Sequence, residues 1–265
     1  MVSFNSLLQG AQDWDAAGHT ASTDWLGLIG RIASVALAVG FALLVVRALA
    51  RGARYRAVSV LAPADRDALA KDVAAVEKRT VGEVVPVVLE RSDRHPVASW
   101  IAGTAALGIG TAILWSFHVL ESAPATFGAQ LLCFLVGFGL ARALPDFRRL
   151  FVSERRATEM AGEQATQEFF AAGLHRTQAE TGVLVFVSLF EHRVIILGDR
   201  GIDAKVDPAL WESACDAVLA GIRRGALREG LAEGLTKVGD VLTEHFPWEA
   251  GDEDEVANHV IVRPE

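Results

Sequence analysis

Long runs of apolar residues occur at three places in the chain. They cover residues 25–46, 97–120 and 123–144. A helix that spans a membrane needs about 20 mostly apolar residues, and each run comes close to that length. The first run is interrupted by Arg31, which lies near enough to one end to reach the lipid headgroups, with Trp25 as an interfacial anchor. The pattern predicts three transmembrane helices, with a buried or interfacial helix as the alternative for the first run.

Charged residues beside the apolar runs predict their orientation. Arginines follow the first and third runs: Arg47, Arg51, Arg54, Arg56, Arg142, Arg148, Arg149, Arg155 and Arg156. The segment before the first run is acidic, and the residues between the second and third runs include Glu121 and no Lys or Arg. Because basic residues favour the cytoplasmic side, we expect the N-terminus outside and the remaining polar segments in the cytoplasm.

These patterns divide the chain into six predicted segments. They are an acidic N-terminal segment (1–24), a transmembrane helix (25–50), the first part of a soluble domain (57–96), a transmembrane hairpin (97–144), the second part of that domain (146–248) and an acidic C-terminal tail (249–265). The two soluble parts together have the size of one small domain. We therefore expect a single domain that is split by the hairpin.

Hydrophobic periodicity in the soluble parts predicts an α/β domain. Helices are expected at 62–80, 153–174, 206–225 and 226–246. The strand at 82–90 contains Pro86, which removes a ladder donor, so an edge strand is expected. Residues 182–190 are nearly continuously apolar, as in a central strand that is covered on both faces. Residues 193–198 would return antiparallel to it through a solvated turn at Glu191–His192. The predicted fold is a small mixed-sheet α/β sandwich that is split by the hairpin and preceded by an additional transmembrane helix.

Several side chains within these helices have predicted roles. Ser153 and Asp207 are placed as N-caps. Met160, Phe169 and Phe170 are expected to face a core, as are four residues at helical spacing, Leu210, Ala214, Val218 and Ile222. Gly230 and Gly234 lie one turn apart and would let their helix approach a neighbour closely. Cys215 is expected to be an inert, buried thiol.

Composition and motifs exclude several classes of function. A net charge of −8 argues against nonspecific nucleic-acid binding, which needs a basic face. The two cysteines form no CxxC motif, so a disulfide framework and a zinc knuckle are excluded. The sequence has no GxSxG, no Walker A motif and no thiolate phosphate loop. The seven histidines lack the spacing of a zinc site. No resident cofactor is predicted.

Four stretches together resemble a known family. They are "EKRTVGEVVPVVLERSD", "GLHRTQAETGVLVFVSLFEHRVIILGDRGI", "WESACDAVLAGIRRG" followed by "GLAEGL", and "EHFP". In this order they resemble the TPM-domain family, and specifically its bacterial integral-membrane branch, in which a transmembrane hairpin splits the domain. The resemblance implies a multi-pass protein of the bacterial inner membrane. The N-terminal apolar run of this chain departs from the pattern of that branch, whose members are expected to begin near Leu61.

The resemblance leaves the activity open. Soluble relatives have been called acid phosphatases and linked to photosystem maintenance, and animal relatives are receptor accessory proteins. No single activity defines the family, so the shared fold does not supply one for this chain.

The expected strand pairing gathers polar residues at one edge of the sheet. If strands 83–89 and 183–189 are parallel, the residues at this edge are Glu83, His175, Arg176, Asp199, Arg200 and Asp203. The opposite edge, with Glu90, Asp93 and Glu191, would face the membrane because the hairpin begins just after Asp93. The candidate site is therefore expected at the membrane-distal edge.

Two interpretations of this edge remain open. In the first, the residues form a site, with Asp199 and Asp203 as ligands of Ca²⁺ or Mg²⁺, Glu83, Arg176 and Arg200 as ligand contacts, and His175 and Asp199 as catalytic candidates. In the second, the same residues form ion pairs and loop caps, including Asp199–Arg200 and Glu83–Arg176 pairs.

The sequence accordingly supports two hypotheses of function. The first is an integral membrane protein whose cytoplasmic TPM-type domain acts as an accessory or assembly module. Its expected partners are the lipid bilayer and another protein, and nucleic acid is not among them. The alternative is a phosphatase-like hydrolase, assisted by a divalent metal, at the membrane-distal edge of the sheet.

Overall fold

The computed structural model describes residues 28–29, 31–47, 60–117, 122–252 and 255–263. It divides into two compact units. The helical unit comprises Met1–Ala50 and Pro96–Phe151, and the sheet unit comprises Arg51–His95 and Val152–Glu265. The elements of the sheet unit are α3 (Pro63–Glu77), β1 (Glu83–Leu89), α7 (Glu154–Ala171), a 3₁₀ helix (Leu174–Arg176), β2 (Gly182–Ser188), β3 (Arg193–Gly198), α8 (Arg200–Asp203), a second 3₁₀ helix (Pro208–Trp211), α9 (Glu212–Arg224), α10 (Leu227–His245) and β4 (Ile261–Arg263).

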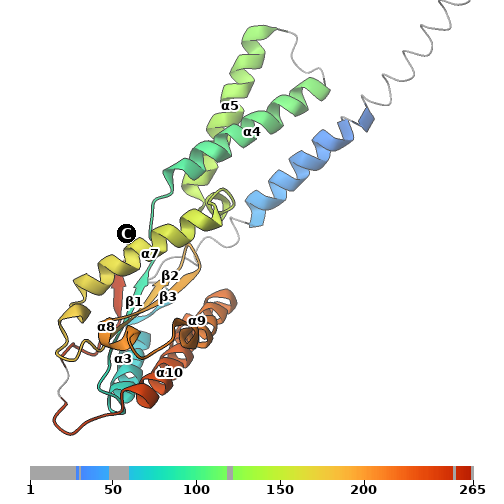
Figure 1. Cartoon of the computed structure of the whole chain (residues 1–265). Coiled ribbons are helices and arrows are strands. Elements are labelled where there is room, and N and C mark those ends of the chain that lie inside the picture. Colours follow the sequence, from blue (N-terminus) through green and yellow to red (C-terminus); the bar gives the residue numbers. More distant parts are fainter. Residues whose placement is uncertain (1–27, 30, 48–59, 118–121, 253–254, 264–265) are drawn as a thin grey trace, which may run out of the picture. The chain divides into compact units, whose positions relative to one another are not determined.

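A four-stranded mixed sheet, in the order β3-β2-β1-β4, forms the centre of the sheet unit (Figure 1). β1 and β2 pair in parallel, from Glu83 opposite Gly182 to Leu89 opposite Ser188. β3 returns antiparallel along β2. Every residue of β2 is buried, which confirms the prediction of a central strand. The chain is therefore a mixed α/β protein, as its periodicity predicted.

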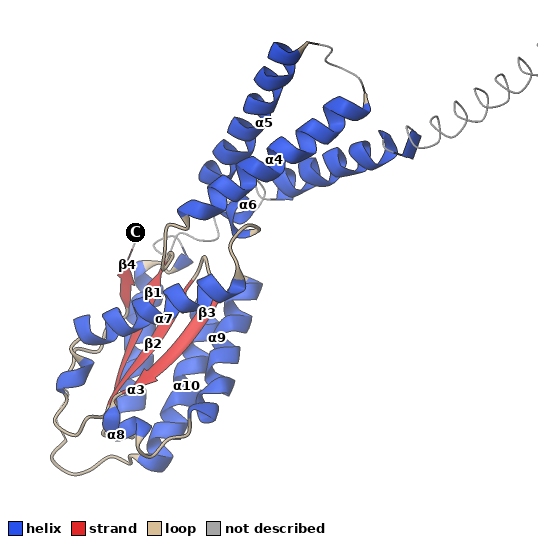
Figure 2. Cartoon of the chain, turned by 45° about the horizontal axis from the view of Figure 1, so that its top comes forward, coloured by secondary structure: helices blue, strands red, loops and turns tan. Residues whose placement is uncertain are grey.

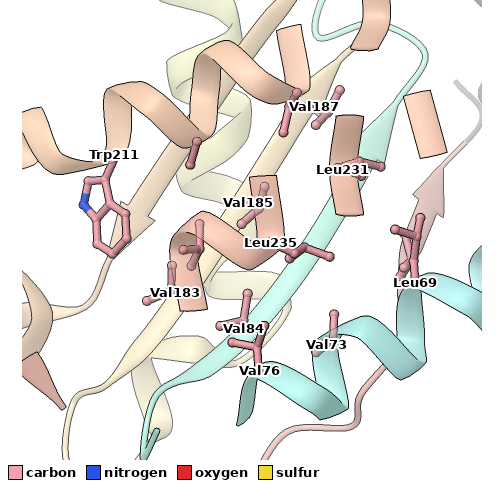
Figure 3. Close-up of a cluster of buried hydrophobic side chains, with 14 of the residues drawn as sticks. Leu69, Val73, Val76, Val84, Val183, Val185, Val187, Trp211, Leu231 and Leu235 are labelled. Atoms are coloured by element: carbon pink, nitrogen blue, oxygen red, sulfur yellow. The ribbon is translucent and has the colours of Figure 1, made fainter. Parts of the chain in front are cut away.

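Helices cover both faces of the sheet, with α7 on one face and α3, α9 and α10 on the other (Figures 1 and 2). Successive strand side chains point to opposite faces, so each strand contributes to two cores. Val84, Val183, Val185 and Val187 pack with residues of α3, α9 and α10, including Leu69, Val73, Leu231 and Leu235 (Figure 3). The intervening residues pack with α7: Val85, Val87, Leu184 and Phe186 against Ala161, Ala165 and Phe169. Because helices cover both faces of the sheet, both sets of side chains on β1 and β2 are buried, which explains why these strands are continuously apolar.

The C-terminal tail changes the position of β1 in the sheet. β4 pairs in parallel with Val87–Leu89, so the last three residues of β1 have a strand on both sides. The prediction of an edge strand is therefore wrong for this half of β1. Pro86 immediately precedes the paired segment, and its missing N–H is compatible with a side that has no strand pairing among the described residues. A three-residue strand leaves almost no periodic signal, so the tail looked separate from the domain.

Two predicted core residues lie at the surface. The helix that follows the Asp207 cap begins with a 3₁₀ turn, which changes the rotation of the side chains, so Trp211 is buried and Leu210 is 44 % exposed. On α7, residues four apart form the buried stripe that ends at Phe169, and the next residue, Phe170, is 56 % exposed. The predicted cap at Ser153 is confirmed, since its hydroxyl accepts a bond from the Arg156 N–H.

Small residues let the last two helices pack closely, as the sequence predicted. A Cβ atom on Gly230 would lie 2.7 Å from the Gly221 Cα, and one on Gly234 would lie 2.4 Å from the Val218 side chain. The α9–α10 contact therefore depends on these glycines. Cys215, on α9, is partly buried, and burial raises the pKa of its thiol to about 11. The thiol is therefore protonated and unreactive at neutral pH, as expected.

The helical unit contains α4 (Pro96–Ser116), α5 (Ala123–Ala143) and α6 (Pro145–Arg149). α4 and α5 are long and apolar enough to cross a membrane. They approach closely at Gly137, where a Cβ atom would lie 2.6 Å from the Ala102 carbonyl oxygen. Residues 31–47 are also helical, and the Ser34 and Ser116 hydroxyls lie 2.9 Å apart. The predicted acidic N-terminal segment, residues 1–24, lies outside the described part of the chain.

Candidate functional site

The predicted site residues lie where three strands begin or end. β1 and β2 begin there and β3 ends there, so the Glu83 N–H donates to the Thr181 carbonyl at 3.2 Å. The Asp199 N–H donates to the Gly182 carbonyl at 2.8 Å. We call this part of the sheet unit the Glu83 end. The strand pairing from which the candidate site was inferred is confirmed.

Asp199 and Asp203 lie together at the Glu83 end. Asp199 caps the short helix α8 by accepting a bond from the Arg200 N–H at 2.9 Å, and Asp203 is the last residue of that helix. Burial and the negative charge of Asp199 both raise the pKa of the Asp203 carboxyl. Two carboxylates supply only part of the six to eight oxygen ligands of Ca²⁺. Within the described ranges, no group of three or more His, Cys, Asp or Glu residues is arranged to hold a metal ion.

The basic residues of the predicted site are dispersed at the surface. The Arg200 guanidinium lies 3.9 Å from the Glu180 carboxylate, so an ion pair forms with Glu180. His175 and Arg176 are exposed on their 3₁₀ helix, and the His175 ring packs against Phe170 with 5.1 Å between ring centroids. These contacts give Arg200 and His175 packing and pairing roles that need no ligand.

A cavity of about 460 Å³ lies at the Glu83 end. Its wall contains the buried Glu83 carboxylate, Lys205 and three acidic residues of the C-terminal tail, Glu249, Asp252 and Glu255. The Glu255 N–H donates to the Glu83 Oε1 at 3.1 Å, which holds the tail against the first residue of β1. Of the six predicted site residues, Glu83 alone lines this cavity. The sequence indicated the acidic character of the tail but not its contact with the sheet.

The other end of the sheet contains a buried carboxylate, Glu191. Its side chain accepts bonds from the Ser92 N–H at 3.1 Å, from His95 Nε2 at 2.6 Å and from the Ser188 hydroxyl. The Asp93 N–H adds a longer contact of 3.4 Å. We call this part the Glu191 end. The prediction of a solvated turn at Glu191 is wrong, because backbone and side-chain donors from the segment after β1 enclose the carboxylate.

The Glu191 network also includes Asp93 and the first turn of α7. His95 is 2 % exposed at its side chain, and its Nδ1 lies 3.5 Å from the Asp93 carboxylate. Arg156, in the first turn of α7, donates to the same carboxylate at 3.3 Å. In the chain, His95 directly precedes Pro96, the first residue of α4. The network thus fixes the backbone segment from which the apolar hairpin begins.

Ser188, His95 and Glu191 have the residue types of a hydrolytic triad, but their hydrogen bonds are arranged differently. In a triad the histidine lies between the serine and the carboxylate and accepts the serine proton. Here the serine and the histidine bind separate oxygens of one carboxylate. Ser188 is also fully buried. The arrangement orients the residues without activating the hydroxyl.

Hydrogen bonding keeps Glu191 ionised in a buried position. Burial raises the pKa of this carboxyl, but hydrogen bonds from His95, Ser188 and the Ser92 N–H outweigh burial and leave the pKa below its ordinary value. The only sequence signal was the position of Glu191 directly after a long apolar run. That signal does not reveal the Ser92 and His95 donors, which lie about a hundred residues earlier.

Comparison with known proteins identifies the domain. The solved structures include a similar chain, the NMR structure of the BA42 protein from the psychrophilic bacterium Bizionia argentinensis. That match has 18 % identity and a TM-score of 0.48, and it covers 77 % of this chain and 95 % of the other. No curated protein matches the chain. The family model of the TPM domain matches residues 148–241, which include α7, β2, β3 and α9. This region of the chain therefore matches the TPM domain, which confirms the resemblance to that family, while the membrane branch stays a prediction.

Proposed function

We propose that the protein is an integral membrane protein of the bacterial inner membrane, with its TPM domain in the cytoplasm as an accessory or assembly module. One observation carries the proposal. β1 and β2 are neighbours in one sheet, yet α4 and α5, both apolar enough to cross a membrane, lie between them in the chain. A sheet with open edges does not form inside lipid, so a hairpin that enters the membrane must return to the side it left.

Charge supports a cytoplasmic position for the domain. Four arginines follow the first apolar run and five follow the third, whereas the turn between α4 and α5 has none. The contact of Ser34 with Ser116 also supports this topology, because it brings the beginning of the first helix to the end of α4. Both helix ends are then on the outer side.

The local roles of the polar residues support an accessory module over an enzyme. Asp199 caps α8, Arg200 pairs with Glu180, and Ser188 is bound to a buried carboxylate. Each of these roles stabilises the fold, and none prepares a nucleophile. A domain of this kind presents its surface to a protein partner.

Reporter fusions test the topology. A fluorescent reporter that matures only in the cytoplasm, fused after Glu265, should fluoresce, and an alkaline phosphatase reporter at the same position should be inactive. The same two reporters inserted between Phe117 and Ser122 should give the reverse pattern. An active phosphatase after Glu265 would overturn the cytoplasmic assignment.

Crosslinking in cells tests the accessory role. A photoreactive amino acid at Leu210, which is 44 % exposed on the sheet unit, should give a discrete crosslinked protein band. The matched control carries the same group at the buried neighbour Trp211 and should give none. Recovery of only lipid or of a diffuse set of abundant proteins from Leu210 and from other exposed positions would contradict the proposal.

The cavity at the Glu83 end favours a second candidate, a metal-assisted phosphatase. Its acidic wall and the Asp199–Asp203 pair at the same end would attract a divalent cation such as Ca²⁺ or Mg²⁺. The test is hydrolysis of a generic phosphoester by the purified chain, with and without either metal. Metal-dependent turnover that is lost in Asp199→Ala and Asp203→Ala would favour this candidate. Turnover that both variants retain would indicate a contaminant.

A further inference from the structure

The C-terminal tail pairs with only one half of the outer edge of β1 (Figure 2). Successive residues of a strand direct their backbone N–H and C=O groups to alternate sides. The Glu83 N–H donates toward β2, so the alternate residues Val84, Pro86 and Val88 face the outer edge. β4 pairs there with Val87–Leu89. The two halves of this edge therefore differ, and the residues that face outward show why.

The first half of the outer edge is closed to a further strand. The Val84 N–H donates to the buried Glu77 carboxylate at 3.0 Å. Pro86 has no N–H to donate. Edge strands are commonly protected from pairing by features of this kind. In the second half, Val88 lies opposite Val262 of β4. A strand can therefore add to β1 at this place and in this register.

The tail shows which side chains fit beside the second half of β1. Val260 is 8 % exposed and packs, with Val262, in the core beside α3, α9 and α10. Ile261 packs in the core beside α7. The Arg263 Nε lies 3.0 Å from Oε2 of Glu168, a buried carboxylate of α7. The place thus fits three successive apolar residues that are followed by a basic residue.

The contacts that hold the tail are local. β4 has three residues, of which Ile261 and Val262 are only partly buried. Before β4, the Glu255 N–H donates to the Glu83 carboxylate at 3.1 Å, and the Glu255 carboxylate accepts from the Gln178 N–H at 2.9 Å. Segments with few buried apolar contacts open at a fraction of the free energy of global unfolding. The tail can therefore leave β1 while the other strands stay paired.

We propose that Val87–Leu89 and Glu168, which we call the β4 site, bind an extended segment of a partner protein, and that the tail occupies the site in its absence. The segment adds as a strand beside Val88 and carries three apolar residues followed by Arg or Lys. In this mode of recognition, backbone hydrogen bonds supply affinity and alternate side chains supply specificity. The partner as the source of the segment rests on the accessory role proposed above, whereas the β4 site itself does not.

The tail competes with the partner segment because it belongs to the same chain. A segment on a short flexible link has an effective concentration in the millimolar range. A partner segment must overcome this concentration before it pairs with Val88. The tail therefore keeps the open half of the edge covered until a matching segment is present, which also prevents unspecific strand pairing.

Binding of a labelled peptide, ANHVIVR, which has the sequence of residues 257–263, tests the β4 site. Fluorescence anisotropy is measured with the full chain in an uncharged detergent. Val260→Asp places a charge at a buried position and should release the tail, so that the peptide binds at least about tenfold more tightly than it binds wild type. Ala257→Asp adds the same charge at an exposed position of the tail. It is the matched control and should bind the peptide as weakly as wild type does.

A second pair of changes tests recognition of the basic residue. In the Val260→Asp chain, Glu168→Gln should weaken binding of ANHVIVR about fivefold, as expected for the loss of a partly exposed ion pair. The peptide ANHVIVQ should show a similar loss with Glu168 present, and Glu168→Gln should add little to it. If Glu168→Gln weakens binding of both peptides equally, the predicted preference for a basic residue is wrong.

Two results would overturn the proposal. One is the absence of peptide binding in both Val260→Asp and Arg263→Glu. The second variant places a negative charge beside Glu168 from an exposed position, so it releases the tail even if Val260→Asp does not fold. The other result is equal binding by wild type, Val260→Asp and Ala257→Asp, which would show that the tail does not occupy the peptide site.

A second copy of the chain is the competing source of the segment. If two differently tagged wild-type copies purify together and Val260→Asp abolishes this, the tails are exchanged between copies and the assignment to a partner is wrong. Peptide binding in detergent depends neither on the reporter fusions nor on crosslinking at Leu210. A failure of the proposed function would therefore leave peptide binding intact, and a failure of peptide binding would leave the topology intact.

Discussion

The two ends of the sheet contain similar residue types in opposite environments. At the Glu83 end, Asp199, Asp203 and Arg200 lie at or near the surface, where Asp199 caps the next residue and Arg200 pairs with the exposed Glu180. At the Glu191 end, one carboxylate is enclosed by the nearby Ser188 hydroxyl and by donors of Ser92 and His95, which are about a hundred residues distant. Water can replace the hydrogen bonds of a cap at the surface, but it does not replace those of the buried Glu191 network. The Glu83 end, where the sequence predicted a site, is therefore expected to tolerate substitution better than the Glu191 end.

The difference has an energetic reason. A buried ionised carboxylate is stable only if hydrogen bonds and charge offset the loss of water. Glu191 has such bonds from His95, Ser188 and the Ser92 N–H. Removing it leaves those donors buried without an acceptor. Exposed groups such as Asp203 lose little, because water replaces their partners.

Among the substitutions at the two ends, Glu191→Ala is expected to lower the free energy of unfolding the most. Breaking a buried charged pair costs about 3–5 kcal/mol of the free energy of unfolding, and the alanine also leaves a cavity. The measurement is chemical denaturation of the full chain in detergent. The matched control is Glu180→Ala, an exposed glutamate with a 3.9 Å ion pair, which should cost less than about 1 kcal/mol. Equal stability of the two variants would remove the distinction between the ends.

The pH dependence of stability should come in part from Glu191. Its pKa is lowered in the folded state, so its contribution is present above the ordinary glutamate pKa of about 4.3 and is lost as pH falls through the folded value. Wild-type stability should therefore decline in acid. Glu191→Gln should be less stable than wild type at pH 7 and should show a shallower decline. A decline of the same slope in both chains would assign the acid sensitivity to other groups.

Asp199→Ala should have a smaller effect. It removes the cap of α8, which costs about 1 kcal/mol by comparison with other N-caps. Asp199→Asn preserves a side-chain oxygen and should recover most of that loss. Denaturation of the three chains in parallel measures the effect. A loss as large as that of Glu191→Ala would show that the Glu83 end also depends on a buried network.

Asp203→Asn should have the smallest effect, and the opposite sign. Burial and Asp199 raise the pKa of Asp203, so its negative charge is unfavourable in the folded state above that pKa. The variant should be slightly more stable than wild type at pH 7, and the difference should vanish below about pH 3.9, the ordinary aspartate value. If Ca²⁺ reverses the sign of the difference at pH 7, Asp203 is a metal ligand. Thermal unfolding with and without Ca²⁺ provides the measurement.

The fold was largely predictable because its signals are local. The apolar run of 182–190, the caps at Ser153 and Asp207 and the small residues Gly230 and Gly234 each act within a few residues or on one helix face. The candidate site was predictable in part, since strand order alone placed Glu83 and Asp199 at one end. It did not reveal the cavity there, whose wall depends on the tail.

The sequence by itself determined which segments are apolar, which strands are covered on both faces and where the helices begin. These properties follow from periodicity and from capping, which depend on neighbours in the chain. Only the tertiary structure decided that Glu191 is buried and that β4 covers the last residues of β1. Both depend on backbone groups far away in the chain, and a backbone N–H is the same whichever residue carries it. Residue identity therefore does not show where such a donor lies until the strands have paired.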